Sequence, residues 1–163
     1  MWLDAMKKLR GRMLSGQIKN QYPEVDDYAG HIAKCHQGER VLDVGCGHQV
    51  IKPFVKGEYV GIDAFPLSAD VTAMKAEEMT FEDKSFDTVY CFAVLDGVED
   101  LNLACKQIKR VCRGNIVILT GIDIEPDMYH TYKITEAFLD ETFGHASLKY
   151  WVTDKVLLAE YYV

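Results

Sequence analysis

The chain has 163 residues, of which 48% are hydrophobic and 26% charged, a length and composition typical of one globular domain. Its net charge of −7 argues against a broad attraction to phosphate backbones, so we expect no nucleic-acid partner. No stretch approaches the roughly 20 consecutive apolar residues that a bilayer span requires, so we expect no membrane association.

The chain has five cysteines, an odd number with no CxxC pair among them. This pattern indicates reduced thiols rather than disulfides, and it predicts no metal site. The first residues lack the long apolar run and small-residue cleavage site of a secretory signal. We therefore expect a cytoplasmic protein.

The hydrophobic pattern predicts a helical N-terminal part followed by alternating strands and helices. Residues 1–36 are expected to carry two helices, over 1–20 and 24–35, that could form a lid over a site. Residues 37–163 would form the core of the same single domain, 1–163. The elements predicted there are strands 40–44, 58–63, 69–73, 86–92, 115–119, 146–152 and 156–162, a short helix 48–55, and helices 98–110 and 135–143.

Strands that alternate with helices and end in a hairpin are typical of an α/β protein with a doubly wound, mostly parallel sheet. We predict a seven-stranded sheet of this kind with an antiparallel terminal hairpin. Such sheets bind ligands outside the carboxyl ends of their strands, near the point where the strand order reverses. The polar motifs of this chain follow strand ends, which points to a site at that edge.

The first motif closes strand 40–44, where Asp43 precedes Gly45 and Gly47. Glycines allow a sharp turn and a close approach of backbone to ligand. A carboxylate beside the ligand suits a cationic amino group and suits a pyrophosphate badly. Val50 also stands where the dinucleotide pattern GxGxxG needs its third glycine. The second motif is Asp63, which ends strand 58–63 and is placed to accept hydrogen bonds from ribose hydroxyls.

The third motif is an acidic passage, AEE over 76–78, followed by SFDTV over 85–89. With LDVGCG over 42–47, these segments resemble the class I S-adenosylmethionine-dependent methyltransferases of the small-molecule type. The resemblance runs from about residue 40 to 119 and implies a Rossmann-like methyltransferase fold with S-adenosylmethionine as cofactor. It implies cofactor contacts from Asp43, Gly45, Cys46, Gly47 and Gln49 at the methionine end, Asp63 at the ribose, Ala76 and Glu77 at the adenine, and Cys91 and Phe92 at the methyl group.

Two residues depart from the family pattern. Gln49 stands where a third glycine is frequent, and we expect it to narrow the pocket or contact the carboxylate of the ligand. Lys75 stands where an aspartate often accepts the adenine amine, which a lysine cannot do. The segment after Asp63 is also short, so a helix common in the family is expected to be reduced or missing.

Asp96 and His130 are the candidate general bases for methyl transfer. Asp96 follows strand 86–92 on the expected acceptor side, although it could equally cap the next helix. His130 lies in a polar, aromatic loop over 125–132, a segment that could bind a ligand or simply pack on the surface. The aromatic residues of the last hairpin are expected to belong to the sheet core; they are Tyr150, Trp151, Tyr161 and Tyr162.

We therefore expect a methyltransferase that acts on a small molecule or a protein side chain. The motifs of base-directed DNA methyltransferases do not follow strand 86–92. Two alternatives remain open: a non-catalytic relative that serves as a partner or regulatory subunit, and a nucleotide-dependent oxidoreductase. A chain with no inserted cap domain would also be consistent with a homodimer or a partner subunit that completes the pocket.

Overall fold

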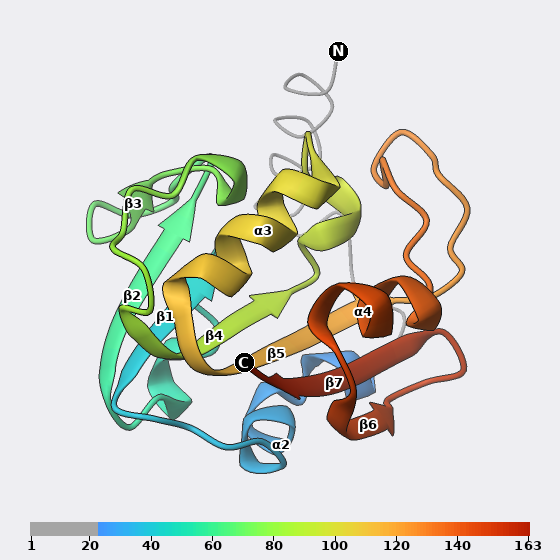
Figure 1. Ribbon diagram of the computed structural model, residues 1–163, viewed down its shortest axis with the longest axis horizontal. Coiled ribbons are helices and arrows are strands. Elements are labelled where there is room, and N and C mark those ends of the chain that lie inside the picture. Colours follow the sequence, from blue (N-terminus) through green and yellow to red (C-terminus); the bar gives the residue numbers. More distant parts are fainter. Residues whose placement is uncertain (1–22) are drawn as a thin grey trace.

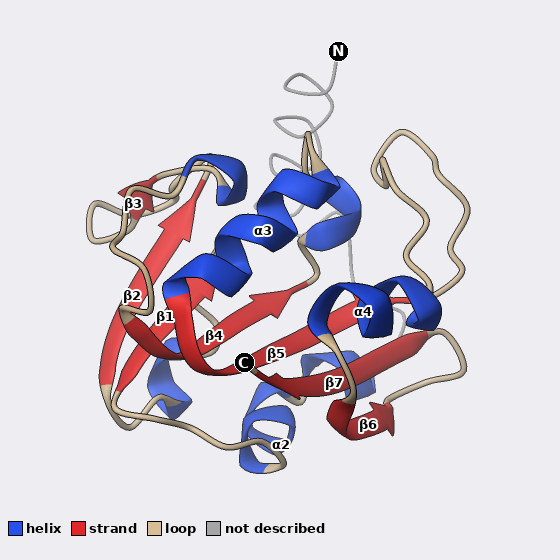
Figure 2. Cartoon of the chain, in the orientation of Figure 1, coloured by secondary structure: helices blue, strands red, loops and turns tan. Residues whose placement is uncertain are grey.

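The computed structural model describes residues 23–163. The predicted helix over 1–20 therefore lies outside the described residues, and so does most of the predicted lid. Seven strands form one sheet in the order β3-β2-β1-β4-β5-β7-β6 (Figures 1 and 2). The strands are β1 (Arg40–Val44), β2 (Glu58–Asp63), β3 (Thr72–Ala73), β4 (Phe86–Phe92), β5 (Cys112–Gly121), β6 (Ala146–Trp151) and β7 (Val156–Tyr162).

The sheet confirms the predicted fold class. Strands β1 to β5 pair in parallel, and β7 runs antiparallel between β5 and β6. From β1 the chain moves outward to β2 and β3, then returns to place β4 on the other side of β1. The strand order therefore reverses between β1 and β4, which puts the predicted ligand site at their carboxyl ends.

Helices cover the two faces unequally (Figure 1). They are α2 (Tyr28–Ala33), α3 (Leu101–Val111) and α4 (Glu136–Phe143), with 3₁₀ turns η1 (Pro23–Asp26), η2 (Lys52–Phe54), η3 (Ala76–Glu78) and η4 (Leu95–Gly97). Along β4 the side chains alternate between two cores, as a pleated strand requires: Val89 and Cys91 pack with α3, whereas Tyr90 packs with Ile32 of α2. The larger core lies on the α3 and α4 face.

Local caps explain where the predicted helices and the observed ones differ. The predicted helix 24–35 is split by Asp27, whose carboxylate accepts the amide of Gly30 at 3.0 Å and starts α2. The predicted helix 98–110 begins only at Leu101, because Asp100 caps it by accepting the amide of Leu103 at 2.9 Å. The short helix predicted over 48–55 is reduced to η2, and the segment between β2 and β3 has no helix, as expected.

The assignment of the hairpin aromatics to the core is wrong for three of the four. Tyr161 is fully buried, but Tyr150, Trp151 and Tyr162 are 43%, 42% and 56% exposed. These residues lie on the edge strand β6 and at the end of β7, where the small α2 leaves that face of the sheet open. Lys34 at the end of α2 partly covers this region, with its ammonium 4.7 Å from the centre of the Tyr150 ring.

All five cysteines are free, and four of them are buried. Residues 23–163 contain no cluster of three His, Cys, Asp or Glu side chains arranged to hold a metal ion. Within the same residues, no helix combines the length and the apolar character needed to cross a membrane.

The Asp100 cap makes a testable contribution to stability. Asp100→Ala should lower the free energy of unfolding by about 1 kcal/mol, because one amide at the start of α3 loses its partner. Asp100→Asn, which keeps an oxygen at the same position, should retain most of that stability. Urea unfolding followed by circular dichroism measures both variants, and equal losses in the two would contradict a capping role.

Candidate functional site

A glycine loop joins the carboxyl end of β1 to the neighbouring strands. Gly45 and Gly47 have φ angles of +67° and +50°, a region that favours glycine. A Cβ on Gly45 would lie 2.4 Å from a methyl group of Val94, so the loop packs directly against the segment that follows β4. A Cβ on Gly47 would meet nothing within 4 Å, which leaves open space beside that backbone. The sequence therefore places a bare backbone edge next to an open region, as the first motif predicts.

A pocket of about 370 Å³ opens beside this loop on the α2 face of the sheet. Four of the predicted site residues line it, namely Asp43, Gly45, Cys46 and Phe92. The remaining lining residues are Val25, Tyr28, Val50, Ile51, Ala93 and Leu119. The wall contributed by η1 and α2 is part of the lid that the sequence predicts over 1–36.

Asp43 is the buried acidic group of the pocket. Its carboxylate is 3% exposed and accepts a 2.7 Å hydrogen bond from the hydroxyl of Tyr59 on β2. Burial raises the pKa of Asp43 to about 7, the hydroxyl of Tyr59 acts in the opposite direction, and the negative charge of Asp63 raises it further. A cation that entered the pocket would therefore find a carboxyl group that gains from ionising beside it.

Tyr59 is a site residue that the motif analysis missed. Its hydroxyl reaches Asp43 past Gly61, where a Cβ would lie 3.0 Å from that hydroxyl and 2.9 Å from the sulfur of Cys46. The available signal was a glycine in the interior of β2, which often marks a close approach of other groups. Tyr28 was read only as part of a helix face, because its place in the pocket depends on tertiary packing.

Asp63 connects the end of β2 to the glycine loop. It is 3% exposed, and its two carboxylate oxygens accept the amides of Gly47 at 2.9 Å and Phe65 at 2.8 Å. A carboxylate has about four acceptor positions, so these two bonds leave capacity for further donors. Asp63 thus holds the loop in place and keeps the property expected of a ribose ligand.

Ala76 and Glu77 lie in η3, and both are buried. The carboxylate of Glu77 accepts the amides of Glu99 at 2.7 Å and Asp100 at 3.1 Å, so it fastens η3 to the start of α3. Lys75, the first departure from the family pattern in this segment, pairs with Glu99 at 2.8 Å. These contacts explain why two acidic residues follow Lys75 at this point of the chain.

Gln49 points toward the loop after β2. Its side-chain amide donates to Ser68 at 2.9 Å and to Asp70 at 3.1 Å, and Lys52 donates to its oxygen at 3.1 Å. Gln49 also has a positive φ of 56°. The structure therefore gives this residue a role that the sequence did not suggest, which is to tie the glycine loop to the helix-free segment 64–71.

Cys91 and Phe92 point to opposite faces at the end of β4. Phe92 lines the pocket and stacks on Tyr28, with 6.3 Å between ring centres and 22° between planes. Cys91 is 1% exposed and packs in the core shared with α3, and burial raises the pKa of its thiol well above the usual value. The side chain of Phe92, and not that of Cys91, therefore faces the pocket.

The two candidate bases, Asp96 and His130, lie together. The carbonyl of Asp96 in η4 accepts the amides of Thr131 and Tyr132 at 2.6 and 3.1 Å, which docks the loop 123–135 onto the segment after β4. Nε2 of His130 then lies 3.7 Å from the carboxylate of Asp96. Burial raises the pKa of Asp96, and the nearby His130 lowers it. Asp96 does not cap α3, because Asp100 does.

The environment of Asp43 makes opposite predictions for two neighbours. Tyr59→Phe should raise the pKa of Asp43 above about 7, because the carboxylate loses the donor that stabilises it. Asp63→Asn should lower that pKa, because a nearby negative charge is removed. Titration of the Asp43 carboxyl carbon by NMR measures both. Shifts of the same sign in the two variants would contradict this description of the site.

Comparison with known proteins agrees with the geometry. Residues 42–119 match a family model described as a methyltransferase domain. A search of curated protein sequences found no match. Among solved structures, a SAM-dependent methyltransferase from Aquifex aeolicus is 14% identical, with a TM-score of 0.69 over 93% of this chain and 97% of that one.

Two further structures share the fold. The 1,6-didemethyltoxoflavin-N1-methyltransferase of Burkholderia thailandensis is 14% identical, with a TM-score of 0.71 over 99% of this chain and 90% of that one. A chain from the complex between the Haloferax volcanii Trm112 methyltransferase activator and a methyltransferase is 16% identical, with a TM-score of 0.70 over 98% and 96%. The family match, the strand order and the acidic strand ends beside a glycine loop together show that this chain belongs to the class I S-adenosylmethionine-dependent methyltransferases.

Proposed function

We propose that this chain transfers the methyl group of S-adenosylmethionine to a small molecule or a protein side chain, with the cofactor bound in the pocket beside the glycine loop. The observation that carries the proposal is the pair of buried carboxylates, Asp43 and Asp63, at the ends of two adjacent strands. The loop between them, through the amide of Gly47, is hydrogen-bonded to Asp63.

The residues present fit this cofactor in charge and in space. Asp43 lies in the pocket wall with its carboxylate buried, where a cationic α-amino group would offset the cost of its burial. Asp63 retains acceptor positions for the two hydroxyls of a ribose. The free space beside Gly47 allows close approach of a ligand to the backbone. A dinucleotide pyrophosphate would instead meet two carboxylates, which weighs against the oxidoreductase alternative.

The aromatic wall suits the reacting end of the cofactor. S-adenosylmethionine supplies a methyl group on a positively charged sulfur. The faces of Tyr28 and Phe92 attract positive charge and exclude water from the part of the pocket that they line. These side chains would orient the methyl group by packing and charge, without taking part in bond changes.

The acceptor is proposed more coarsely than the cofactor. A small molecule is consistent with the absence of a large apolar docking face on the pocket side, and the Burkholderia thailandensis relative has 1,6-didemethyltoxoflavin and S-adenosylhomocysteine bound. The relative in complex with the Trm112 activator shows that a chain of this fold can associate with a protein partner. A non-catalytic role as a partner subunit would be distinguished by cofactor binding without turnover.

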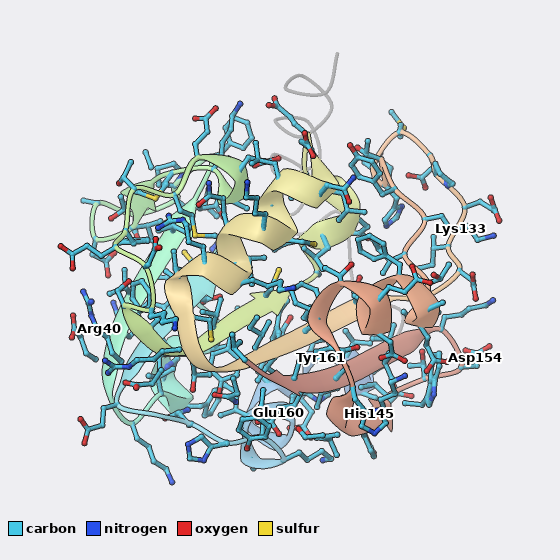
Figure 3. All side chains as sticks on the ribbon, in the orientation of Figure 1. Arg40, Lys133, His145, Asp154, Glu160 and Tyr161 are labelled. Carbon is cyan, nitrogen blue, oxygen red and sulfur yellow. The ribbon has the colours of Figure 1, made fainter. Side chains whose placement is uncertain are left out.

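Calorimetric titration with S-adenosylhomocysteine tests the proposal. The wild-type protein should bind with a dissociation constant in the micromolar range, and Asp63→Ala should weaken binding at least tenfold, because the ribose loses its acceptor and the loop its anchor. Asp154→Ala is the matched control, since Asp154 lies in the exposed turn between β6 and β7, away from the pocket (Figure 3).

NADH titrated under the same conditions should give no binding. Absence of heat and of any thermal shift with S-adenosylhomocysteine in the wild-type protein would overturn the proposed cofactor. Equal binding by wild type and Asp63→Ala would overturn the proposed site.

A further inference from the structure

Asp127 joins the two candidate bases in a single hydrogen-bonded arrangement. Oδ1 of Asp127 accepts from the amides of Tyr129 and His130, at 2.7 and 2.8 Å, and lies 2.9 Å from Nδ1 of His130. The amide of Asp127 in turn donates to the carbonyl of His130 at 2.9 Å. These four contacts close a tight turn, so the imidazole ring is held by a carboxylate that its own loop orients.

The contact with Asp127 selects one form of the neutral ring. A carboxylate can only accept, so Nδ1 must carry the hydrogen that is donated to it. Nε2 then holds a lone pair and points toward Asp96. Burial acts to raise the pKa of Asp127, but the two turn amides and the His130 ring lower it overall, so this carboxyl group stays ionised.

The separation between His130 and Asp96 leaves a place for a donor. At 3.7 Å, Nε2 and the Asp96 oxygen are too far apart for a direct hydrogen bond. A single N–H or O–H group could nevertheless lie about 2.8 Å from both atoms. The His130 side chain is 33% exposed and that of Asp96 is 17% exposed, so such a group can approach from solvent.

This place lies next to the methyl end of the proposed cofactor site. Asp96 follows Val94 by two residues, and Val94 packs on Gly45 of the glycine loop. The charges of Asp96 and Asp43 both act on Cys91, so both carboxylates lie near the end of β4. The loop 123–135, orange in Figure 1, rises at the same end of the sheet where β4 and β5 terminate. Lys133 marks that side of the molecule in Figure 3, opposite Arg40 at the amino end of β1.

We propose that Asp127, His130 and Asp96 form a proton-accepting unit, and that the methyl acceptor is therefore a group that must lose a proton, an O–H or N–H group. This inference rests on the proposed function and narrows its substrate class. Nε2 of His130 would be the catalytic base, Asp127 a positioning residue, and Asp96 a second contact for the acceptor. Acceptors without a hydrogen on the reacting atom, such as thioethers and tertiary amines, would have no use for this unit.

The proposed step balances without any further reactant. A lone pair of the acceptor oxygen or nitrogen forms the new bond to the methyl carbon. The carbon–sulfur bond breaks, and its electron pair stays on sulfur, which becomes neutral. The acceptor proton moves to Nε2 of His130, and the resulting imidazolium lies between the carboxylates of Asp127 and Asp96. The proton then leaves to solvent through the exposed side of the ring.

The tautomer of His130 tests the arrangement without a known acceptor. Long-range ¹⁵N–¹H NMR spectra of the full chain, with the signal assigned through His130→Gln, should show the ring predominantly protonated on Nδ1 when neutral. Asp127→Ala should return it to the Nε2-protonated form that an unconstrained histidine prefers. Asp127→Asn keeps an acceptor oxygen and should restore the Nδ1–H form. Asp123→Asn, a change in the same loop at a residue that does not contact the ring, is the control and should have no effect.

Three results would overturn the proposal. The first is an Nε2-protonated ring in the wild type, which would leave no lone pair for the acceptor proton. The second is a tautomer that is the same in wild type and Asp127→Ala. The third is methylation of dimethyl sulfide or N,N-dimethylaniline by the wild type at a rate that His130→Gln does not change. Calorimetry with S-adenosylhomocysteine on His130→Gln separates this from the proposed function, since binding should match the wild type whatever the tautomer.

Discussion

The site depends on a carboxylate that the fold buries beside a second one. Asp43 and Asp63 end adjacent parallel strands, so their side chains emerge at one edge of the sheet, and the mutual repulsion raises the pKa of Asp43 beyond what burial does. Such a pair costs free energy in the absence of a ligand. Three neighbours offset the cost: the hydroxyl of Tyr59 for Asp43, and the amides of Gly47 and Phe65 for Asp63. A cationic ligand would offset the remainder, which gives the pocket its selectivity.

The rest of the structure positions this edge. The glycine loop can turn only because Gly45 and Gly47 take positive φ angles, and Gly45 has no side chain to collide with Val94. On one side of the loop, Gln49 ties it to Ser68 and Asp70, in the place where a helix is absent. On the other side, η4 carries Asp96 and receives the loop that brings His130. Cofactor binding and proton removal are thus supplied by neighbouring segments after β1, β2, β4 and β5.

Much of the fold could be predicted because buried strands have a simple pattern. The bounds of β1, β2, β4 and β7 agree with those predicted from their apolar runs, since both faces of these strands are largely covered. Helix starts were less predictable, because they depend on which acidic side chain reaches an amide three residues later, as at Asp27 and Asp100. The exposed Tyr150 and Trp151 were misassigned because an edge strand and a core strand have the same residue preferences.

The candidate site was predictable where chemistry is local to a motif. The order carboxylate, glycine, glycine after a strand indicates a ligand loop in any sequence, and it identified Asp43, Gly45 and Gly47. Groups that reach the site from elsewhere were not predictable in this way. Tyr59 depends on the register of β2 against β1, and Asp127 depends on a turn that folds back on His130. Glu77 was expected to be near the adenine, but its carboxylate is used to fasten α3.

Proton release on ligand binding tests the role of Asp43 most directly. At pH 6.5 more than half of the Asp43 carboxyl groups should carry a proton in the free protein, because their pKa is about 7. The α-amino group of S-adenosylhomocysteine should drive that proton off, so calorimetry in buffers of different ionisation enthalpy should show release of about half a proton or more per ligand bound. Asp43→Asn should abolish the release. Binding without proton release in the wild type, or the same release in both proteins, would contradict the pairing of Asp43 with the ligand's ammonium group.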